Sequence, residues 1–203
     1  MGLVENSHMA GERMAIELQD GSMYVGYSFG HEESVAGELV FQTGMVGYPE
    51  SITDPSYRGQ ILVITWPLVG NYGVPSREAR DDLLKEIPAH FESAEIHISG
   101  LVIAHYAGED YSHYLATSSL GTWLKEQKIP ALYGVDTRLL TKKIRQQGSM
   151  LGKLLLESNA ANGHIDGLEF DMTAPGERSL QQYFEKIQWS DPNKRNLVAE
   201  GKV

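Results

Sequence analysis

The sequence predicts an α/β fold that mixes parallel and antiparallel strands. Residues 14–18 and 23–27 flank Asp20-Gly21, a turn that is typical of an antiparallel hairpin. Residues 96–104 are apolar on both faces near their end, which indicates a buried, central strand. The second half has a strand–helix–strand order, and this order favours some parallel pairing because parallel strands need a crossover connection.

The other elements follow from local pattern and from capping residues. In the first half, residues 38–42 and 60–65 are strand-like, and we expect this half to form antiparallel hairpins. Residues 81–91 predict a short helix that Pro88 interrupts. The second half predicts, in chain order, a helix over 119–127 that ends before Pro130, a strand over 131–133, a helix over 137–147 between an Asp136 cap and a Gly148 stop, and a strand over 151–156.

Length and composition indicate one core with an extension on each side. The 203 residues suit one domain, which we place at residues 14–156. Residues 1–13 are either a native extension or a tag remnant, since Ser7-His8-Met9 resembles a vector scar. Residues 157–203 are polar and predict an extension without a second core.

Charge and cysteine usage narrow the class of partner. The net charge of −10 disfavours nucleic acid and anionic membranes, because phosphate contacts need clustered Lys and Arg. The one basic cluster, Lys142, Lys143 and Arg145, lies late in a predicted helix, where cations complement the helix dipole. The chain has no cysteine, no apolar run near the roughly 18 residues of a membrane helix and no apolar segment typical of a secretory signal. We therefore expect a cytoplasmic protein that neither binds nucleic acid nor enters a membrane.

A turn-rich segment between two strands is the best candidate for a binding loop. Residues 41–73 are rich in glycine, proline and tyrosine, and loops held between buried strands often carry binding residues. Within this segment, Asp54 can accept backbone N–H bonds and Pro55 fixes the next φ angle, so that Ser56 is presented on a rigid turn. From the residues alone, this turn and the turn at 70–73 are interpreted as structural, although backbone N–H groups at 70–73 could also bind an anion.

No catalytic or metal-binding group of residues emerges from the sequence. Residues 26–30 match the G-x-S-x-G nucleophile elbow at Ser28, but the motif needs a helix after the serine, and another strand is predicted there. A turn between strands is the simpler interpretation. The histidines lack zinc-binding spacing, and His105 and His113 are interpreted as hydrogen-bonded loop residues rather than site residues.

Several long motifs, in order, resemble one family. The segments GYPESITDPSYRGQILVITWPLVGNYG and GVDTRLLTKKIRQQGSMLGKL, together with GELVFQTGMVGY at 37–48, are similar to the N-terminal domain of the small, glutamine-hydrolysing component of carbamoyl phosphate synthetase. The resemblance covers about residues 14–156. Two further segments, FESAEIHISGLVIAHY and YSHYLATSSLGTWL, are most similar to the pyrimidine-pathway form. That form begins a multifunctional polypeptide that also contains aspartate transcarbamoylase. The arginine-pathway form is the alternative.

The resemblance implies a three-layer β/β/α module with a docking role. In this family the domain docks the glutaminase side on the synthetase side, and the nucleophile is a cysteine of the following class I amidotransferase domain. We therefore expect no catalytic residue in this cysteine-free chain. Residues 157–203 would include the connector toward that amidotransferase domain, and the chain would be the N-terminal region of a longer enzyme.

The family's DPSY serine corresponds to Ser56. The resemblance implies that Ser56 contacts glutamine from across the domain boundary. The parent enzyme would convert glutamine, bicarbonate and ATP to carbamoyl phosphate, with ATP and magnesium bound in the synthetase region and no cofactor or metal in this chain. Two alternatives remain: a free-standing hydrolase that uses Ser28, and an interaction module without any substrate contact.

Overall fold

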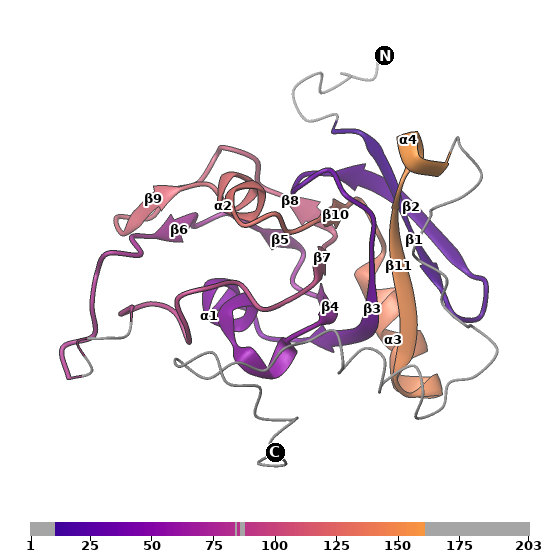
Figure 1. Cartoon of the computed structure of the whole chain (residues 1–203), viewed down its shortest axis with the longest axis horizontal. Helices are drawn as coiled ribbons and strands as arrows, with labels where there is room; N and C mark the ends of the chain where they lie inside the picture. Colours follow the sequence, from indigo (N-terminus) through magenta and orange to yellow (C-terminus); the bar gives the residue numbers. More distant parts are fainter. Residues whose placement is uncertain (1–10, 84, 86–87, 161–203) are drawn as a thin grey trace, which may run out of the picture. The chain divides into compact units, whose positions relative to one another are not determined.

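The computed structural model describes residues 11–83, 85 and 88–160 (Figure 1). In this part of the chain, the strands in order are β1 (Arg13–Leu18), β2 (Met23–Ser28), β3 (Val35–Gln42), β4 (Gln60–Ile64), β5 (Leu68–Val69), β6 (Val74–Pro75), β7 (Gly100–Val102), β8 (His105–Tyr106), β9 (Ala116–Ser118), β10 (Ala131–Tyr133) and β11 (Met150–Leu156). The helices are α1 (Tyr48–Thr53), the 3-10 helix η1 (Pro55–Tyr57), α2 (Leu120–Glu126), α3 (Thr137–Gln147) and α4 (Glu157–Ala160).

Seven of these strands close into a barrel in the order β1-β11-β3-β4-β7-β10-β2. Strands β3, β4, β7 and β10 run parallel to one another, whereas β1, β2 and β11 join them through antiparallel pairs. Two small sheets, β5-β8 and β6-β9, lie outside the barrel. The predicted mixture of strand directions in an α/β fold is confirmed.

The prediction of antiparallel hairpins throughout the first half is wrong at β3 and β4. The β1–β2 hairpin forms as expected, with Ile16 opposite Tyr24. However, β3 pairs in parallel with β4, with Leu39 beside Ile61. The connection between them contains α1 and η1, which carry the chain back along the sheet. A connection of this kind returns the next strand in the parallel direction.

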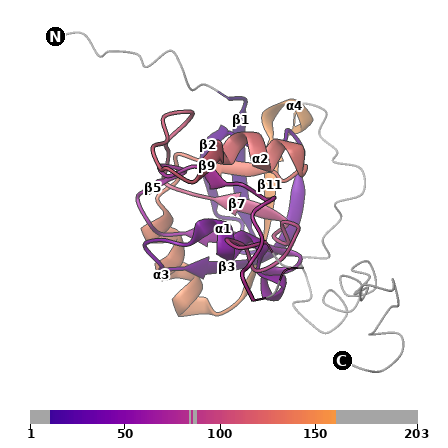
Figure 2. The ribbon, with the colours of Figure 1, turned by 90° about the vertical axis from the view of Figure 1, so that its left-hand side faces the viewer.

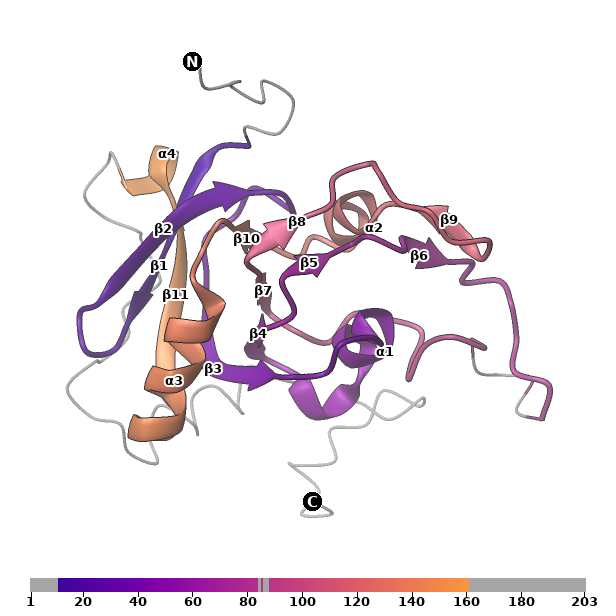
Figure 3. The same cartoon turned by 180° about the vertical axis from the view of Figure 1, so that it is seen from behind.

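The central parallel strands are buried on both faces. Alternate residues of β4 enter two different hydrophobic clusters, because successive side chains of a strand point to opposite faces. Leu62 and Ile64 pack with α1 and α2 through residues such as Ile52 and Trp123. The opposite cluster contains Ile61 and Val63 together with residues of α3. Figure 2 shows α1 and α2 on the side that faces the viewer, and Figure 3 shows α3 along the barrel beside β3 and β11.

The predicted boundaries of α3 are confirmed in detail. The Asp136 side chain accepts a hydrogen bond from Leu139 N at 2.9 Å and so caps the first turn. At the other end, Gly148 has a φ of 86°, a left-handed conformation that glycine adopts without steric cost. The predicted helix over 119–127 is also present as α2, with Ser119 as its cap.

The helix predicted over residues 81–91 is wrong. The described residues of this segment form bends and turns, and Arg80 makes an isolated antiparallel bridge with Pro88. The Ala89 N–H donates to Ala79 O at 2.9 Å, so the segment folds back on itself. Pro88 has no N–H for a helical bond and restricts the residue before it. Leu83 is 91% exposed and forms no apolar helix face.

The central strand predicted over residues 96–104 is shorter than expected. Only Gly100–Val102 form β7, which lies between β4 and β10 as a central strand should. Ile96 and Ile98, which precede it, are also buried, but two N–H groups of this segment bond outside the sheet. Ile96 N donates to the Gln127 side chain and His97 N donates to Ile52 O. These bonds replace the ladder that a longer strand would need.

The described chain continues beyond the predicted core into α4. Ser158 N donates to Glu12 Oε1 at 2.7 Å, which links α4 to the residue before β1. The predicted extensions otherwise lie outside the described residues, so the domain boundaries at 13 and 157 stay predictions. Within the described residues, no helix has both the length and the apolar character that crossing a membrane requires.

Candidate functional site

The Ser56 turn has the local geometry that its sequence predicts. Asp54 Oδ1 accepts a hydrogen bond from Ser56 N at 2.8 Å and caps η1. Pro55 begins η1, where its fixed φ angle is compatible with a helical turn. The Ser56 side chain is exposed, and its hydroxyl makes no hydrogen bond within the described residues. The turn therefore fixes the backbone of Ser56 while its hydroxyl remains available.

Thr53, the last residue of α1, is held in place by hydrogen bonds just before this turn. Its side chain is completely buried, and its Oγ1 donates to Pro49 O at 2.7 Å and accepts from Glu92 N at 3.1 Å. Its carbonyl oxygen accepts from Ser93 Oγ at 2.7 Å. The two bonds to Glu92 and Ser93 tie the end of α1 to a segment about forty residues later and so fix the start of the Ser56 turn.

Two stacked tyrosines hold the start of α1. Gly47 N and Tyr48 N both donate to Tyr72 Oη, at 2.8 and 3.0 Å, which satisfies two N–H groups at the start of the helix. Tyr48 Oη donates to Gly73 O at 2.6 Å, and the two rings stack 4.2 Å apart. Burial raises the pKa of Tyr72 and keeps its hydroxyl neutral. Residues 70–73 therefore form a turn with a structural task, as predicted.

Charged groups and a half-buried histidine surround the base of the Ser56 turn. His97 N donates to Ile52 O at 2.9 Å, and His97 O accepts from Gly59 N at 3.2 Å. Burial, and then the nearby Arg58 charge, lower the pKa of His97, although Glu95 and Asp54 oppose them. No sequence motif indicated His97, because its hydrogen bonds near Asp54 are to residues far away in the sequence, Ile52 and Gly59.

Ser28 does not form a nucleophile elbow. It is the last residue of β2, is 4% exposed and pairs with Leu132 of β10. The chain then passes through an irregular segment into β3, without the helix that would present an exposed hydroxyl. The other candidate residues are also separate from Ser56: His113 is an exposed loop residue whose Nδ1 accepts from Leu115 N at 3.3 Å, and His105 lies beside a pocket.

This pocket is a second candidate site, at the carboxyl ends of the parallel strands. It has a volume of about 680 Å³. Its lining includes the first residue after three of these strands and a residue just beyond the fourth, namely Thr43 after β3, Thr65 after β4, Gly134 after β10 and Ala104 beyond β7. Open α/β sheets and barrels of parallel strands both bind ligands at the carboxyl ends of their strands.

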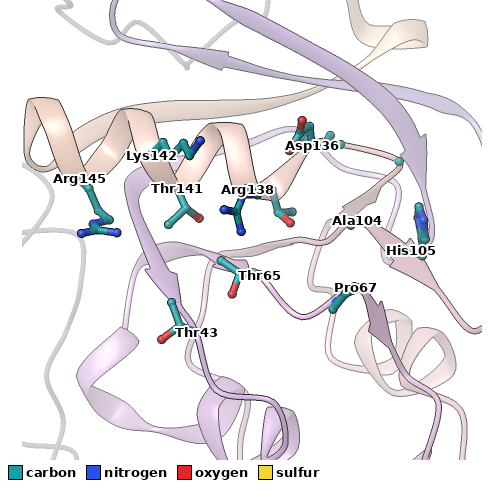
Figure 4. Close-up of a pocket in the computed structure, with 13 residues that line it drawn as sticks. Thr43, Thr65, Pro67, Ala104, His105, Asp136, Arg138, Thr141, Lys142 and Arg145 are labelled. Atoms are coloured by element: carbon teal, nitrogen blue, oxygen red, sulfur yellow. The ribbon is translucent and has the colours of Figure 1, made fainter.

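Helix α3 supplies the charged wall of this pocket. Arg138, Lys142 and Arg145 are spaced i, i+4 and i+7 and all line it (Figure 4). Lys143, by contrast, points elsewhere and forms an ion pair with Asp20 in the turn between β1 and β2. The structure thus divides the predicted basic cluster. Arg145 lies in the last turn, as expected for a cation that complements the helix dipole, and Lys143 forms an ion pair that the sequence did not predict. Lys142 and Arg145 also line the pocket with Arg138, which no sequence motif indicated.

Comparison with known proteins identifies the family. Residues 16–154 match the family described as carbamoyl-phosphate synthase small chain, CPSase domain. The chain belongs to this family. The matched residues include most of the barrel, both candidate sites and, among the described helices, all but α4.

Relatives of this carbamoyl-phosphate synthase domain are much longer proteins. The multifunctional protein pyr-3 of Neurospora crassa is 67% identical over 92% of the chain and 10% of its own length. The multifunctional protein URA2 of Saccharomyces cerevisiae is 59% identical over 94% of the chain and 8% of its own length. The mitochondrial carbamoyl-phosphate synthase [ammonia] of Homo sapiens is 47% identical over 91% of the chain and 10% of its own length. The chain thus spans about a tenth of these relatives.

Proposed function

We propose that this domain is a structural and docking part of a glutamine-dependent carbamoyl-phosphate synthetase, and that Ser56 contacts glutamine held by a neighbouring amidotransferase region. The observation that best supports this role is the exposed Ser56 hydroxyl on a turn fixed by Asp54 and Thr53. A hydroxyl whose backbone is already ordered loses little entropy when it binds a polar substrate group. The domain itself would support glutamine hydrolysis without supplying the nucleophile.

The test compares two nitrogen donors in the full-length enzyme. Ser56→Ala should raise the KM for glutamine about two- to tenfold, the value of one neutral hydrogen bond, and leave ammonia-dependent synthesis unchanged. Ser149→Ala is the matched control, because Ser149 is also exposed but lies in the turn between α3 and β11. An equal loss with glutamine and ammonia would contradict the proposal, and an unchanged KM would favour an interaction module without substrate contact.

Exposed apolar side chains support the docking part of the proposal. Met45 and Val46 are 65% and 76% exposed in the segment after β3, and Trp66 and Leu68 are exposed in and next to the segment after β4. Large apolar side chains that share one edge of a domain are typical of a surface that another domain covers. The amidotransferase and synthetase regions of the same polypeptide are the proposed partners.

Docking can be measured with separately expressed regions. We expect the chain to bind the downstream amidotransferase–synthetase region in trans, and Met45→Glu with Val46→Glu should weaken binding at least tenfold, because charge would be buried at the contact. Leu83→Glu is the control, since Leu83 is also exposed, at 91%, and lies in a different loop. Equal effects of both variants would contradict a docking surface at Met45 and Val46.

The order of similarity supports the pyrimidine pathway. The fungal multifunctional proteins in the comparison are 56–67% identical to the chain, whereas the mitochondrial ammonia-dependent enzymes are 46–47% identical. We therefore favour the pyrimidine-pathway enzyme over the arginine-pathway one, with ATP, magnesium and bicarbonate bound in its synthetase region. The chain alone should hydrolyse no glutamine, and activity should require the amidotransferase region. Location in the cytoplasm stays a prediction.

A further inference from the structure

The pocket beside α3 concentrates positive charge in an acidic protein. Arg138, Lys142 and Arg145 face a single carboxylate, Asp136, among its described lining residues. That carboxylate is already engaged, because its Oδ1 accepts the capping bond from Leu139 N. The chain as a whole carries a net charge of −10, so this wall has the opposite sign to most of the surface. A concave site of one sign attracts ions of the other.

The three cations have no partner within the described residues. The ion pairs found there use other cations, namely Arg13 with Glu157, Arg77 with Glu126, Lys85 with Asp82 and Lys143 with Asp20, besides a His31–Glu33 contact. Figure 4 shows Arg138 and Arg145 extending from α3 toward the side where Thr43 and Thr65 lie. The two arginine charges are therefore directed toward the strand ends, and among the described lining residues no carboxylate of another element neutralises them.

A buried hydroxyl in the same wall also lacks a partner. Thr141 is only 7% exposed, lies between Arg138 and Arg145 on α3 and lines the pocket. Its Oγ1 makes no hydrogen bond within the described residues. Buried hydroxyl groups are nearly always hydrogen-bonded, so an unpaired one in a pocket wall indicates a missing ligand or water. This observation is independent of the charges.

The opposite wall is fixed by backbone hydrogen bonds. Thr65 N donates to Gln42 O at 3.1 Å, and Gly134 N donates to Ala104 O at 2.9 Å, so the ends of the parallel strands are tied to one another. His105 N donates to Pro67 O at 3.0 Å and fixes the rim. A rigid wall opposite a cationic helix lets a ligand bind without first ordering the site.

We propose that this pocket binds a small polyanion, a molecule with two or more phosphate or carboxylate groups. Arginine guanidinium groups bind both kinds of oxyanion through paired N–H donors, and the Thr141 hydroxyl can donate one further bond. The volume of about 680 Å³ lies within the range of small-molecule sites. The site is separate from Ser56, which precedes the amino end of β4, whereas the pocket lies beyond its carboxyl end.

Titration of the 203-residue chain with pyrophosphate and with citrate tests the proposal. Amide NMR signals of α3 and of Thr65, Ala104 and Gly134 should shift in a saturable way with at least one probe, and binding should weaken as salt is added. Arg138→Gln with Arg145→Gln should reduce affinity at least about tenfold, and Thr141→Val should reduce it about two- to tenfold. The two probes distinguish a phosphate ligand from a carboxylate ligand.

A matched control separates a built site from general charge attraction. Lys125→Gln with Lys128→Gln removes the same charge from the exposed surface at the end of α2, and binding should remain unchanged. Failure of both probes to bind would overturn the proposal. So would an equal loss in the two double variants. Because the assay uses neither glutamine nor a partner domain, its result is independent of the role proposed for Ser56.

Discussion

At the amino end of β4, the groups around Ser56 are bonded to one another, whereas at its carboxyl end three cations and a buried hydroxyl have no partner within the described residues. Both ends belong to the same parallel strands and are supported by the same two hydrophobic clusters. The amino end therefore fixes the backbone that presents one side chain, and the carboxyl end keeps several groups free to bind. Polar groups that are already paired contribute to the fold, and unpaired ones in a pocket wall are available to a ligand.

We expect the largest difference in the free energy of unfolding between two variants that replace a buried threonine by valine. Thr53→Val removes a hydroxyl that donates to Pro49 O and accepts from Glu92 N, and it should lower the free energy of unfolding by about 2 kcal/mol. Thr141→Val removes a buried hydroxyl without a partner, so stability should stay within about 0.5 kcal/mol or rise slightly. Urea denaturation of both variants measures the difference. Equal costs would mean that Thr141 is as fully bonded as Thr53.

We expect a smaller difference in the free energy of unfolding between variants of two neighbouring lysines of α3. Lys143 pairs with Asp20, and its side chain is 21% exposed, so Lys143→Gln should lower the free energy of unfolding by about 1 kcal/mol after solvent screening. Lys142→Gln should change it by less than about 0.5 kcal/mol, because Lys142 lies one turn after Arg138, a like charge. Thermal and urea unfolding of the two variants provide the comparison.

The contribution of the Lys143–Asp20 ion pair to stability should depend on pH. The hydrogen bond from Lys143, followed by that from Ser22, lowers the pKa of Asp20 from 3.8 to about 2. A lowered carboxyl pKa stabilises the fold above pH 3.8, and this stability is lost as the pH falls toward 2. The wild type and Lys143→Gln should therefore converge in stability over that interval. A constant difference down to pH 2 would show that the ion pair is not its source.

Local chemistry explains which parts of this molecule were predictable. The Asp136 cap, the Gly148 stop and the turn at Asp54 depend on residues within three positions of each other, and all three appear as predicted. The prediction of a helix over 81–91 was wrong because the bridge between Arg80 and Pro88 competes with a helix. The predicted antiparallel direction of β4 was wrong because strand direction depends on how the connection packs, which the strand's own residues do not encode.

The pocket was unpredictable for a related reason. Its lining residues come from the ends of four strands and from α3, and only parallel pairing brings these ends together. One signal was present in the sequence: Arg138, Lys142 and Arg145 share one helix face by their spacing. The family resemblance, by contrast, indicated Ser56 directly. The turn around Ser56 is confirmed, while its contact with glutamine stays a prediction.

The smallest expected effect concerns His97, at the base of the Ser56 turn. Burial and Arg58 lower its pKa below the ordinary value of 6.5, so the unfolded chain binds this proton more readily than the folded one. The contribution of His97 to stability is therefore complete above pH 6.5 and declines as the pH falls below it. His97→Gln should remove this decline, which urea unfolding at about pH 7.5 and about pH 5.5 would detect.

The cause of the shift can be separated from its effect on stability. An NMR titration should place the pKa of His97 below 6.5, and Arg58→Gln should raise it, because the repelling charge is gone while the burial remains. His113→Gln is the control for the stability measurement, since His113 is exposed in a loop on a different part of the chain. If Arg58→Gln left the pKa of His97 unchanged, burial alone would set it, and the charged groups around the Ser56 turn would act independently of His97.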